Sequence, residues 1–141
     1  MKPIAHSAGV RRKEAESEKI TINLGYVDLG HIDLLVQEGF YSNRTDFIRT
    51  SIRNQLVSHG DVLKQTVARR SMVLGLQRYR REDLERLRKA GEQLHIQVLG
   101  LAQIDEDVPT DLARQTIASI TVLGALRASS AVRAALADRI R

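Results

Sequence analysis

Apolar and polar residues alternate strictly between residues 19 and 24, where the sequence reads Lys-Ile-Thr-Ile-Asn-Leu. Side chains on a β-strand point alternately to opposite faces, so this pattern predicts a strand with one apolar and one polar face. The apolar face consists of Ile20, Ile22 and Leu24. A single strand cannot bury such a face, and we therefore expect this segment to pair with a second chain.

Two amphipathic helices are predicted after this strand. Apolar residues recur at helical spacing from Asp28 to Glu38, and a glycine follows at a position that favours a helix end. Ser42 or Asn43 is a suitable N-cap for the second helix, whose buried face would contain Ile48 and Ile52. The predicted order of this segment is therefore strand, helix, helix.

Three copies of the tripeptide Val-Leu-Gly occur in the second half of the chain, starting at Val73, Val98 and Val122. Their spacings of 25 and 24 residues indicate an internal repeat. Each unit begins with a β-rich segment and ends with a helical one. The units comprise residues 71–94, 95–118 and 119–141. Strand, helix, strand at such a short period requires parallel strands, with all the helices on one face of the sheet.

A simpler interpretation of the tripeptide is a buried strand with a tight bend. It is compatible with the repeat, and we favour it over a phosphate-binding role because the glycines lack a G-x-G-x-x-G context. Parallel sheets are normally covered on both faces, whereas this sheet would carry helices on one face only. We therefore expect the bare face or an edge strand of residues 71–141 to contact another copy of the chain.

The length of 141 residues and the 43% content of hydrophobic residues support one domain or two small ones. The predicted fold class is α+β. We expect a flexible N-terminal arm, a strand-helix-helix module, a connecting segment and a three-unit β/α repeat domain with parallel strands. These segments span residues 1–17, 18–58, 59–70 and 71–141, respectively.

The sequence contains no cysteine, which excludes disulfide bonds and thiolate metal sites and favours the cytoplasm. Residues 1–18 contain Arg11, Arg12, Lys13 and three glutamates in place of the apolar core of a signal peptide. No apolar run approaches membrane-spanning length, so we expect no membrane partner.

The net charge of +5 suits a polyanionic partner, but this charge is unevenly distributed. Residues 1–60 contain eight basic and seven acidic residues, so a polyanion would be bound there by a few well-placed groups. The strongest basic cluster comprises Arg69, Arg70, Arg78, Arg80 and Arg81. We interpret this cluster as a solvated linker and helix start, with an additional polyanion contact as the alternative.

Residues 18–58 resemble the ribbon-helix-helix family of bacterial DNA-binding regulators, which includes the Arc, MetJ and CopG repressors. The resemblance is carried by Lys19–Leu24 and by the run from Gly39 to Arg53. It implies that two chains pair their strands into an antiparallel ribbon that enters the major groove of double-stranded DNA. It also implies an obligate dimer, whose shared core would contain Ile20, Ile22, Leu24, Ile48 and Ile52.

On this resemblance, the polar face of the strand, formed by Lys19, Thr21 and Asn23, would contact base edges. Two residues depart from the common pattern of the family. Gly25 stands where many members have a proline, which leaves the entry to the first helix less rigid. Asn23 stands where a long basic residue is common, and it shifts the expected contact toward adenine, with which Asn pairs bidentately.

Phosphate contacts are expected at the N-terminus of the second helix. Ser42, Asn43 and Arg44 would place this end against a phosphate, where free backbone N–H groups and the helix dipole favour an anion. The basic residues at 11–13 would reach along a groove as auxiliary contacts. The glutamates that follow them make an ordinary tail an equal alternative for the arm.

We expect no catalytic residue, metal site or cofactor. The histidines are scattered along the sequence, which is typical of surface or capping positions. They are His6, His31, His59 and His95. The acidic run at 105–107 is interpreted as a solvated turn before Pro109, with weak cation binding as the alternative.

The resulting hypothesis is a DNA-binding transcriptional regulator, a repressor as in most such families, that acts as a dimer or larger oligomer. An antitoxin, whose C-terminal half wraps a toxin, is one alternative. A structural protein of DNA partition that polymerises through its repeats is another. Antitoxin tails tend to lack apolar periodicity, whereas residues 71–141 are patterned for a core.

Overall fold

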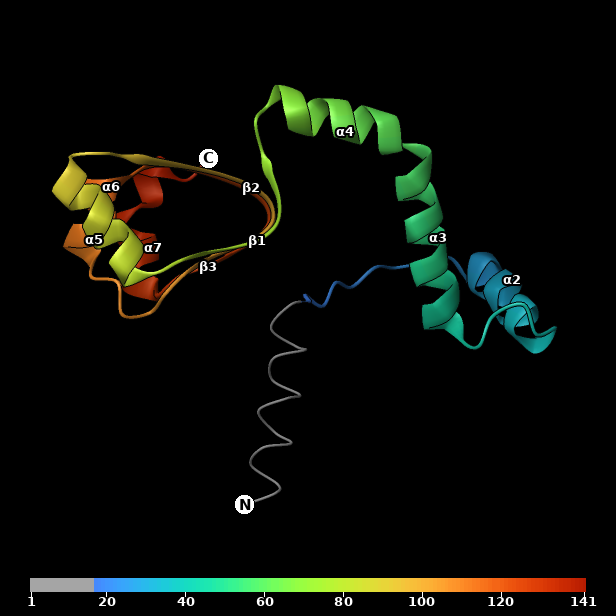
Figure 1. The fold of residues 1–141 in the computed structure, drawn as a ribbon. Coiled ribbons are helices and arrows are strands. Elements are labelled where there is room, and N and C mark those ends of the chain that lie inside the picture. Colours follow the sequence, from blue (N-terminus) through green and yellow to red (C-terminus); the bar gives the residue numbers. More distant parts are fainter. Residues whose placement is uncertain (1–16) are drawn as a thin grey trace, which may run out of the picture. The chain divides into compact units, whose positions relative to one another are not determined.

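The computed structural model describes residues 17–141, and the arm residues Arg11, Arg12 and Lys13 lie outside this range. The chain divides into two compact units, the first ending at Asp61 and the second comprising Val62–Arg141. Figure 1 shows the helices and strands of both units along the chain.

The first unit contains an extended segment followed by two helices, α2 (Tyr26–Gln37) and α3 (Arg44–Ser58). Both predicted helices are present, although α2 begins two residues before the expected Asp28. The predicted strand at 19–24 is extended but is not assigned as a strand. A strand requires a hydrogen-bonded neighbour, and the described part of this single chain supplies none, so the ribbon stays a prediction.

A helix that the sequence analysis did not predict, α4 (Gly60–Arg69), occupies the expected connecting segment. Asp61 lies in its first turn and Arg69 in its last, where each charge is favourable to the helix dipole. Its apolar residues Val62 and Leu63 are exposed. The segment between the two predicted modules is therefore helical.

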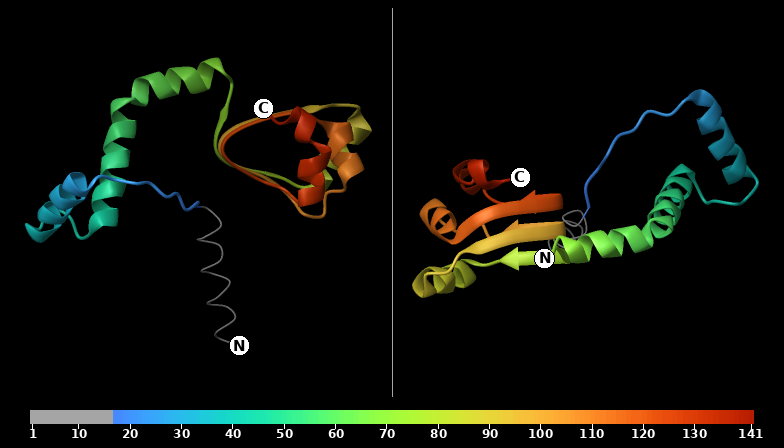
Figure 2. Two further views of the ribbon diagram at one scale, coloured as in Figure 1. Left: turned by 180° about the vertical axis from the view of Figure 1, so that it is seen from behind. Right: turned by 90° about the horizontal axis from the view of Figure 1, so that it is seen from above.

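The second unit contains a parallel sheet in the order β1-β2-β3, as predicted. Its strands are β1 (Val73–Tyr79), β2 (Leu94–Ile104) and β3 (Ile117–Arg127). The helices α5 (Arg81–Ala90), α6 (Thr110–Thr116) and α7 (Ser130–Ala135) alternate with them, followed by the 3-10 turn Ala137–Arg139. Figures 1 and 2 show the three helices together on the concave side of the curved sheet.

The core of the second unit lies between the sheet and these helices. Alternate residues of β2, among them Ile96, Val98 and Ala102, are fully buried. Leu84 of α5 and Leu112 of α6 pack into the same cluster. The apolar side chains on one face of the sheet and on the inner faces of the helices thus form a single buried layer.

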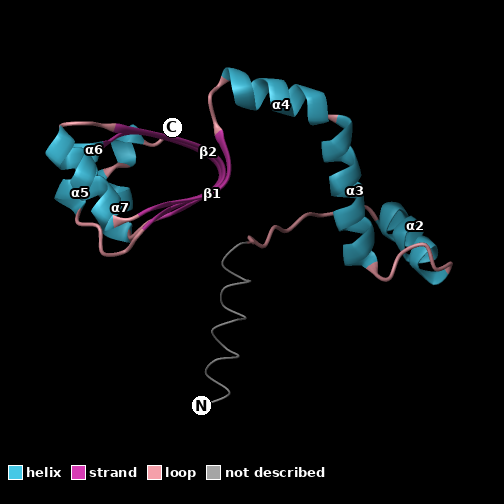
Figure 3. Cartoon of the chain, in the orientation of Figure 1, coloured by secondary structure: helices cyan, strands magenta, loops and turns pink. Residues whose placement is uncertain are grey.

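The three Val-Leu-Gly tripeptides lie side by side in the sheet, with Gly75 paired to Gly100 and Gly100 to Gly124. All three glycines have positive φ angles, of 112°, 138° and 122°. Other residues adopt such angles only at a cost, so these positions favour glycine. Each tripeptide therefore combines strand residues with a glycine in an unusual backbone conformation, within the curved strands shown in Figure 3.

Among residues 17–141, none of the helices combines the length and the apolar character needed to span a bilayer.

Candidate nucleic-acid interface

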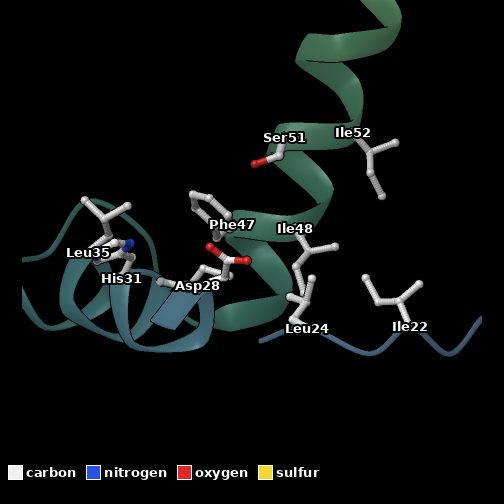
Figure 4. Close-up of a pocket in the computed structure, with 10 residues that line it drawn as sticks. Ile22, Leu24, Asp28, His31, Leu35, Phe47, Ile48, Ser51 and Ile52 are labelled. Atoms are coloured by element: carbon white, nitrogen blue, oxygen red, sulfur yellow. The ribbon is translucent and has the colours of Figure 1, made fainter. Parts of the chain in front are cut away.

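The extended segment before α2 presents the residues that the sequence analysis assigned to base contacts. Lys19, Thr21 and Asn23 are all exposed. The alternating residues Ile22 and Leu24 line a pocket with Ile48 and Ile52 of α3. Figure 4 shows these four side chains gathered along one side of α3. The segment therefore has an apolar side toward α3 and free polar side chains.

The pocket has a volume of about 380 Å³ and an almost entirely apolar lining. Four of the five residues expected in a dimer core line it, and the exception is Ile20, which is exposed. Ile22 and Ile52 are each about half exposed. Exposed apolar side chains around an open pocket are typical of a surface that binds another apolar surface.

Asp28 and His31 of α2 and Ser51 of α3 add polar groups to the lining of this pocket, and Figure 4 shows Asp28 between the two helices. The sequence predicts that His31 is a surface or capping residue. It is indeed exposed, but it lies beside apolar residues of the pocket. Helical spacing from Asp28 could have placed His31 on this face, because the two are three residues apart.

The N-terminus of α3 is closed by a reciprocal cap. The side-chain oxygen of Asn43 accepts the backbone N–H of Asp46 at 2.8 Å, which makes Asn43 the N-cap. The carboxylate of Asp46 in turn accepts the backbone N–H of Ser42 at 3.0 Å. This pattern differs from the capping box in one respect, because the carboxylate at the third helical position accepts from the residue before the N-cap and not from the N-cap itself. The two hydrogen bonds together fix where α3 begins.

An aromatic pair supports the same turn. The rings of Tyr41 and Phe47 lie edge to face, with centroids 5.0 Å apart and planes at 87°. Aromatic rings favour this arrangement because the positive edge of one ring meets the negative face of the other. This ring contact joins a residue before the N-cap to a residue in the first turn of α3, so it also stabilises the loop that leads into the helix.

Arg44, the first residue of α3, forms an ion pair with Asp33 of α2. Its Nε and Nη2 atoms donate to the two carboxylate oxygens at 2.7 and 2.8 Å. The hydrogen bond from the guanidinium is the main cause that lowers the pKa of Asp33, and the pair raises the pKa of Arg44. From the sequence, Arg44 was expected at a phosphate-contacting helix end, and its partner Asp33 was not predicted.

The basic cluster of the second unit is partly neutralised. Arg78 donates to both carboxylate oxygens of Asp105, at 2.8 and 2.9 Å, and Arg81 pairs with Glu85. Asp105 belongs to the acidic run that was considered for weak cation binding. Its carboxylate is occupied by a guanidinium, and within residues 17–141 no cluster of three metal-binding side chains occurs.

One further polar pair lies on the sheet, where His95 Nδ1 is 2.8 Å from Ser119 Oγ. The two residues are paired in register on β2 and β3. This contact gives His95 a hydrogen-bond partner, in keeping with its interpretation as a surface residue.

Comparison with known proteins yields one match. The profile of the Ribbon-Helix-Helix transcriptional regulator family matches residues 15–133, which includes most of the second unit. No curated protein and no solved structure matches the chain. Regulators of this family bind DNA and typically form dimers. Because the match covers most of the chain, the protein belongs to the ribbon-helix-helix transcriptional regulator family.

Proposed function

We propose that the protein is a sequence-specific DNA-binding repressor that acts as a homodimer in the cytoplasm. The observation that carries this proposal is the apolar pocket lined by Ile22, Leu24, Ile48 and Ile52. A second copy would bring the same four side chains to the pocket and bury them in a shared core. Strand pairing between the copies would then expose a two-stranded polar face.

That polar face would be the part of the protein that reads DNA. Two antiparallel copies of residues 19–24 would present Lys19, Thr21 and Asn23 twice, and a two-stranded ribbon fits the major groove. Lys19 would donate to guanine, while Asn23 would pair bidentately with adenine. The three side chains are exposed in the single chain, as this role requires.

The N-terminus of α3 would hold the phosphate backbone. The cap formed by Ser42, Asn43 and Asp46 fixes this end, and the N–H groups at the start of a helix attract an anion. Such contacts fix the register of a protein on DNA without reading its sequence. Specificity would therefore depend on the ribbon, and orientation on α3.

The second unit would join dimers into larger assemblies. Val98 and Ala102 are buried toward the helices, so Leu99 and Leu101 point to the opposite face of the sheet. The leucines at neighbouring register positions, Leu74 and Leu123, have exposed fractions of 69% and 47%. We call these four residues the outer leucine patch. Burial of this patch against another copy would remove an apolar surface from water.

The outer leucine patch also favours one of the alternative functions. A protein that coats DNA in partition would need a second interface besides the dimer core, and this patch is separate from the pocket of the first unit. The antitoxin alternative has less support, because residues 73–140 contain a packed sheet and helices with a buried core.

A chromatin-binding map of the tagged full chain in its native host tests these functions. A repressor predicts occupancy at a few promoters with the same sequence motif. Occupancy of a continuous tract would favour partition, and occupancy of its own promoter alone would favour an antitoxin. No enrichment at any site would contradict the proposed function.

A further inference from the structure

The ion pair between Asp33 and Arg44 lies at the end of α3 that the proposed function places against DNA. Side-chain exposed fractions of 46% for Asp33 and 55% for Arg44 show that the pair is at the surface and accessible. Both carboxylate oxygens of Asp33 are used, and the guanidinium is held by two of its donors. Bidentate pairs of this kind fix the orientation of Arg more strictly than a single hydrogen bond does.

Most other polar groups at this helix end are also occupied within the protein. Asn43 accepts from the N–H of Asp46, and the carboxylate of Asp46 accepts from the N–H of Ser42. The backbone N–H groups of Arg44 and Thr45 stand at the first two positions of α3, and within residues 17–141 they donate no hydrogen bond. A phosphate could therefore accept hydrogen bonds from these backbone N–H groups without any contact to the guanidinium of Arg44.

The charge of the first unit makes the state of Arg44 important. Residues 17–61 contain four basic residues, Lys19, Arg44, Arg49 and Arg53, against six acidic ones. Affinity for DNA of any sequence comes mainly from basic side chains that displace counterions from phosphates. Pairing with Asp33 neutralises one of the four basic side chains of residues 17–61, so it weakens this sequence-independent attraction.

We propose that Asp33 is a specificity-determining residue, because it holds Arg44 in an ion pair and thereby keeps this guanidinium off the DNA backbone. The N-terminus of α3 then contacts phosphate through backbone N–H groups, which require a fixed geometry. Non-specific binding stays weak, and the base contacts of the ribbon decide affinity. This inference rests on the proposed function, since it concerns how the same surface binds DNA.

The test measures binding of the full chain to a short fluorescent duplex of random sequence at a series of salt concentrations. The slope of log affinity against log salt reports the number of phosphates neutralised, with about 0.9 for each. Asp33→Asn should steepen the slope by about 0.9, because the freed Arg44 gains a phosphate partner. Arg44→Gln should leave the slope unchanged, and Asp33→Asn combined with Arg44→Gln should return it to the wild-type value.

Glu38→Gln is the matched control, because it removes one negative charge from the same unit without breaking an ion pair of the described structure. An equal effect of Asp33→Asn and Glu38→Gln would overturn the inference in favour of a general charge effect. A slope that falls by about 0.9 in Arg44→Gln would also overturn it, because Arg44 would then be a phosphate ligand already.

Circular dichroism of each variant establishes that it is folded. If Asp33→Asn unfolds the first unit, Arg44→Gln alone tests the inference. An unchanged salt slope in Arg44→Gln supports it, and a slope reduced by about 0.9 contradicts it. Failure of the wild-type chain to bind any duplex would overturn the proposed function. Contradictory salt slopes in the variants of a chain that does bind would overturn only the role of Asp33.

Discussion

Gly100 and Gly75 occupy paired positions on neighbouring strands, so close together that a β-carbon on Gly100 would overlap the carbonyl oxygen of Gly75. Gly124 has the same relationship to Gly100. A β-carbon on Gly75 would meet no atom within 4 Å, because the added β-carbons of Gly100 and Gly124 each meet the preceding strand and no strand of the described residues precedes β1. The glycines of β2 and β3 are thus required by close approach of the strands as well as by their φ angles.

Gly100→Ala should therefore destabilise the second unit more than Gly75→Ala does. Backbone strain and overpacking together should cost roughly 2–5 kcal/mol at Gly100, whereas strain alone should cost about 1–3 kcal/mol at Gly75. Urea unfolding followed by circular dichroism measures both. Gly30→Ala in α2, where the backbone is helical and space is open, is the control and should be neutral or slightly stabilising. Equal losses for Gly75 and Gly100 would contradict the close-approach argument.

Periodicity in the sequence predicted much of this structure. The spacing of Val73, Val98 and Val122 predicted three parallel strands, and these residues are paired in register. Both helices of the first unit were predicted from their apolar spacing, and Asn43 was one of two expected caps. The helices and the cap follow from local sequence, since they depend on residues that lie within a few positions of one another. The strands were predicted from the repeat, because its spacing of 24–25 residues is visible in the sequence.

Other features depend on contacts that the sequence does not encode locally. The ion pair of Arg44 joins residues eleven positions apart on two helices, and many acidic residues were equally available as partners. α4 was missed because Arg69 and Arg70 were interpreted as part of a solvated linker, although Leu63 and Val67 lie four residues apart, as on one helix face. The start of α2 at Tyr26 was not predicted, because the preceding Gly25 has no side chain that could cap the helix and mark its boundary in the sequence.

Loss of Asn23 should affect binding to the specific site alone. Asn23→Ala is expected to weaken binding to a site selected from a random DNA library by roughly 1–3 kcal/mol, because a bidentate base contact is lost. Affinity for random duplexes should hardly change. Fluorescence anisotropy with both duplexes measures the difference, and Asn54→Ala, an exposed change on α3, is the matched control. Equal weakening on both duplexes would argue against a base contact.

A charge in the outer leucine patch should prevent assembly beyond the dimer. Leu74 is exposed and lies on β1, an edge strand of the sheet. Leu74→Asp should therefore lower the free energy of unfolding by less than about 1 kcal/mol. An interface that buried this charge would be strongly destabilised. Sedimentation velocity should show complexes larger than a dimer for the wild type and dimers for Leu74→Asp. Ala131→Asp, exposed on α7, should assemble like the wild type.

A wild-type chain that stays dimeric at high micromolar concentration would contradict an assembly role for this patch. Unchanged assembly of Leu74→Asp would place the contact elsewhere on the protein.

A charge in the pocket of the first unit should prevent dimerisation itself. Ile22→Asp would bury an unpaired carboxylate in the shared core, at a cost of several kcal/mol, and the helices of the first unit should unfold with the loss of the dimer. Circular dichroism and light scattering of the full chain measure both effects. Val57→Asp, an exposed position of α3 outside the pocket, should remain dimeric. A folded monomer of Ile22→Asp would contradict an obligate ribbon.

The central claim, that two copies of residues 19–24 together form one DNA-reading ribbon, is tested most directly by stoichiometry. Sedimentation of the full chain with a short duplex that carries one selected site gives the number of chains bound per site. We predict two chains per site, with no detectable complex of a single chain, and loss of the complex in Ile22→Asp. Tight binding of one chain to one site would contradict the account.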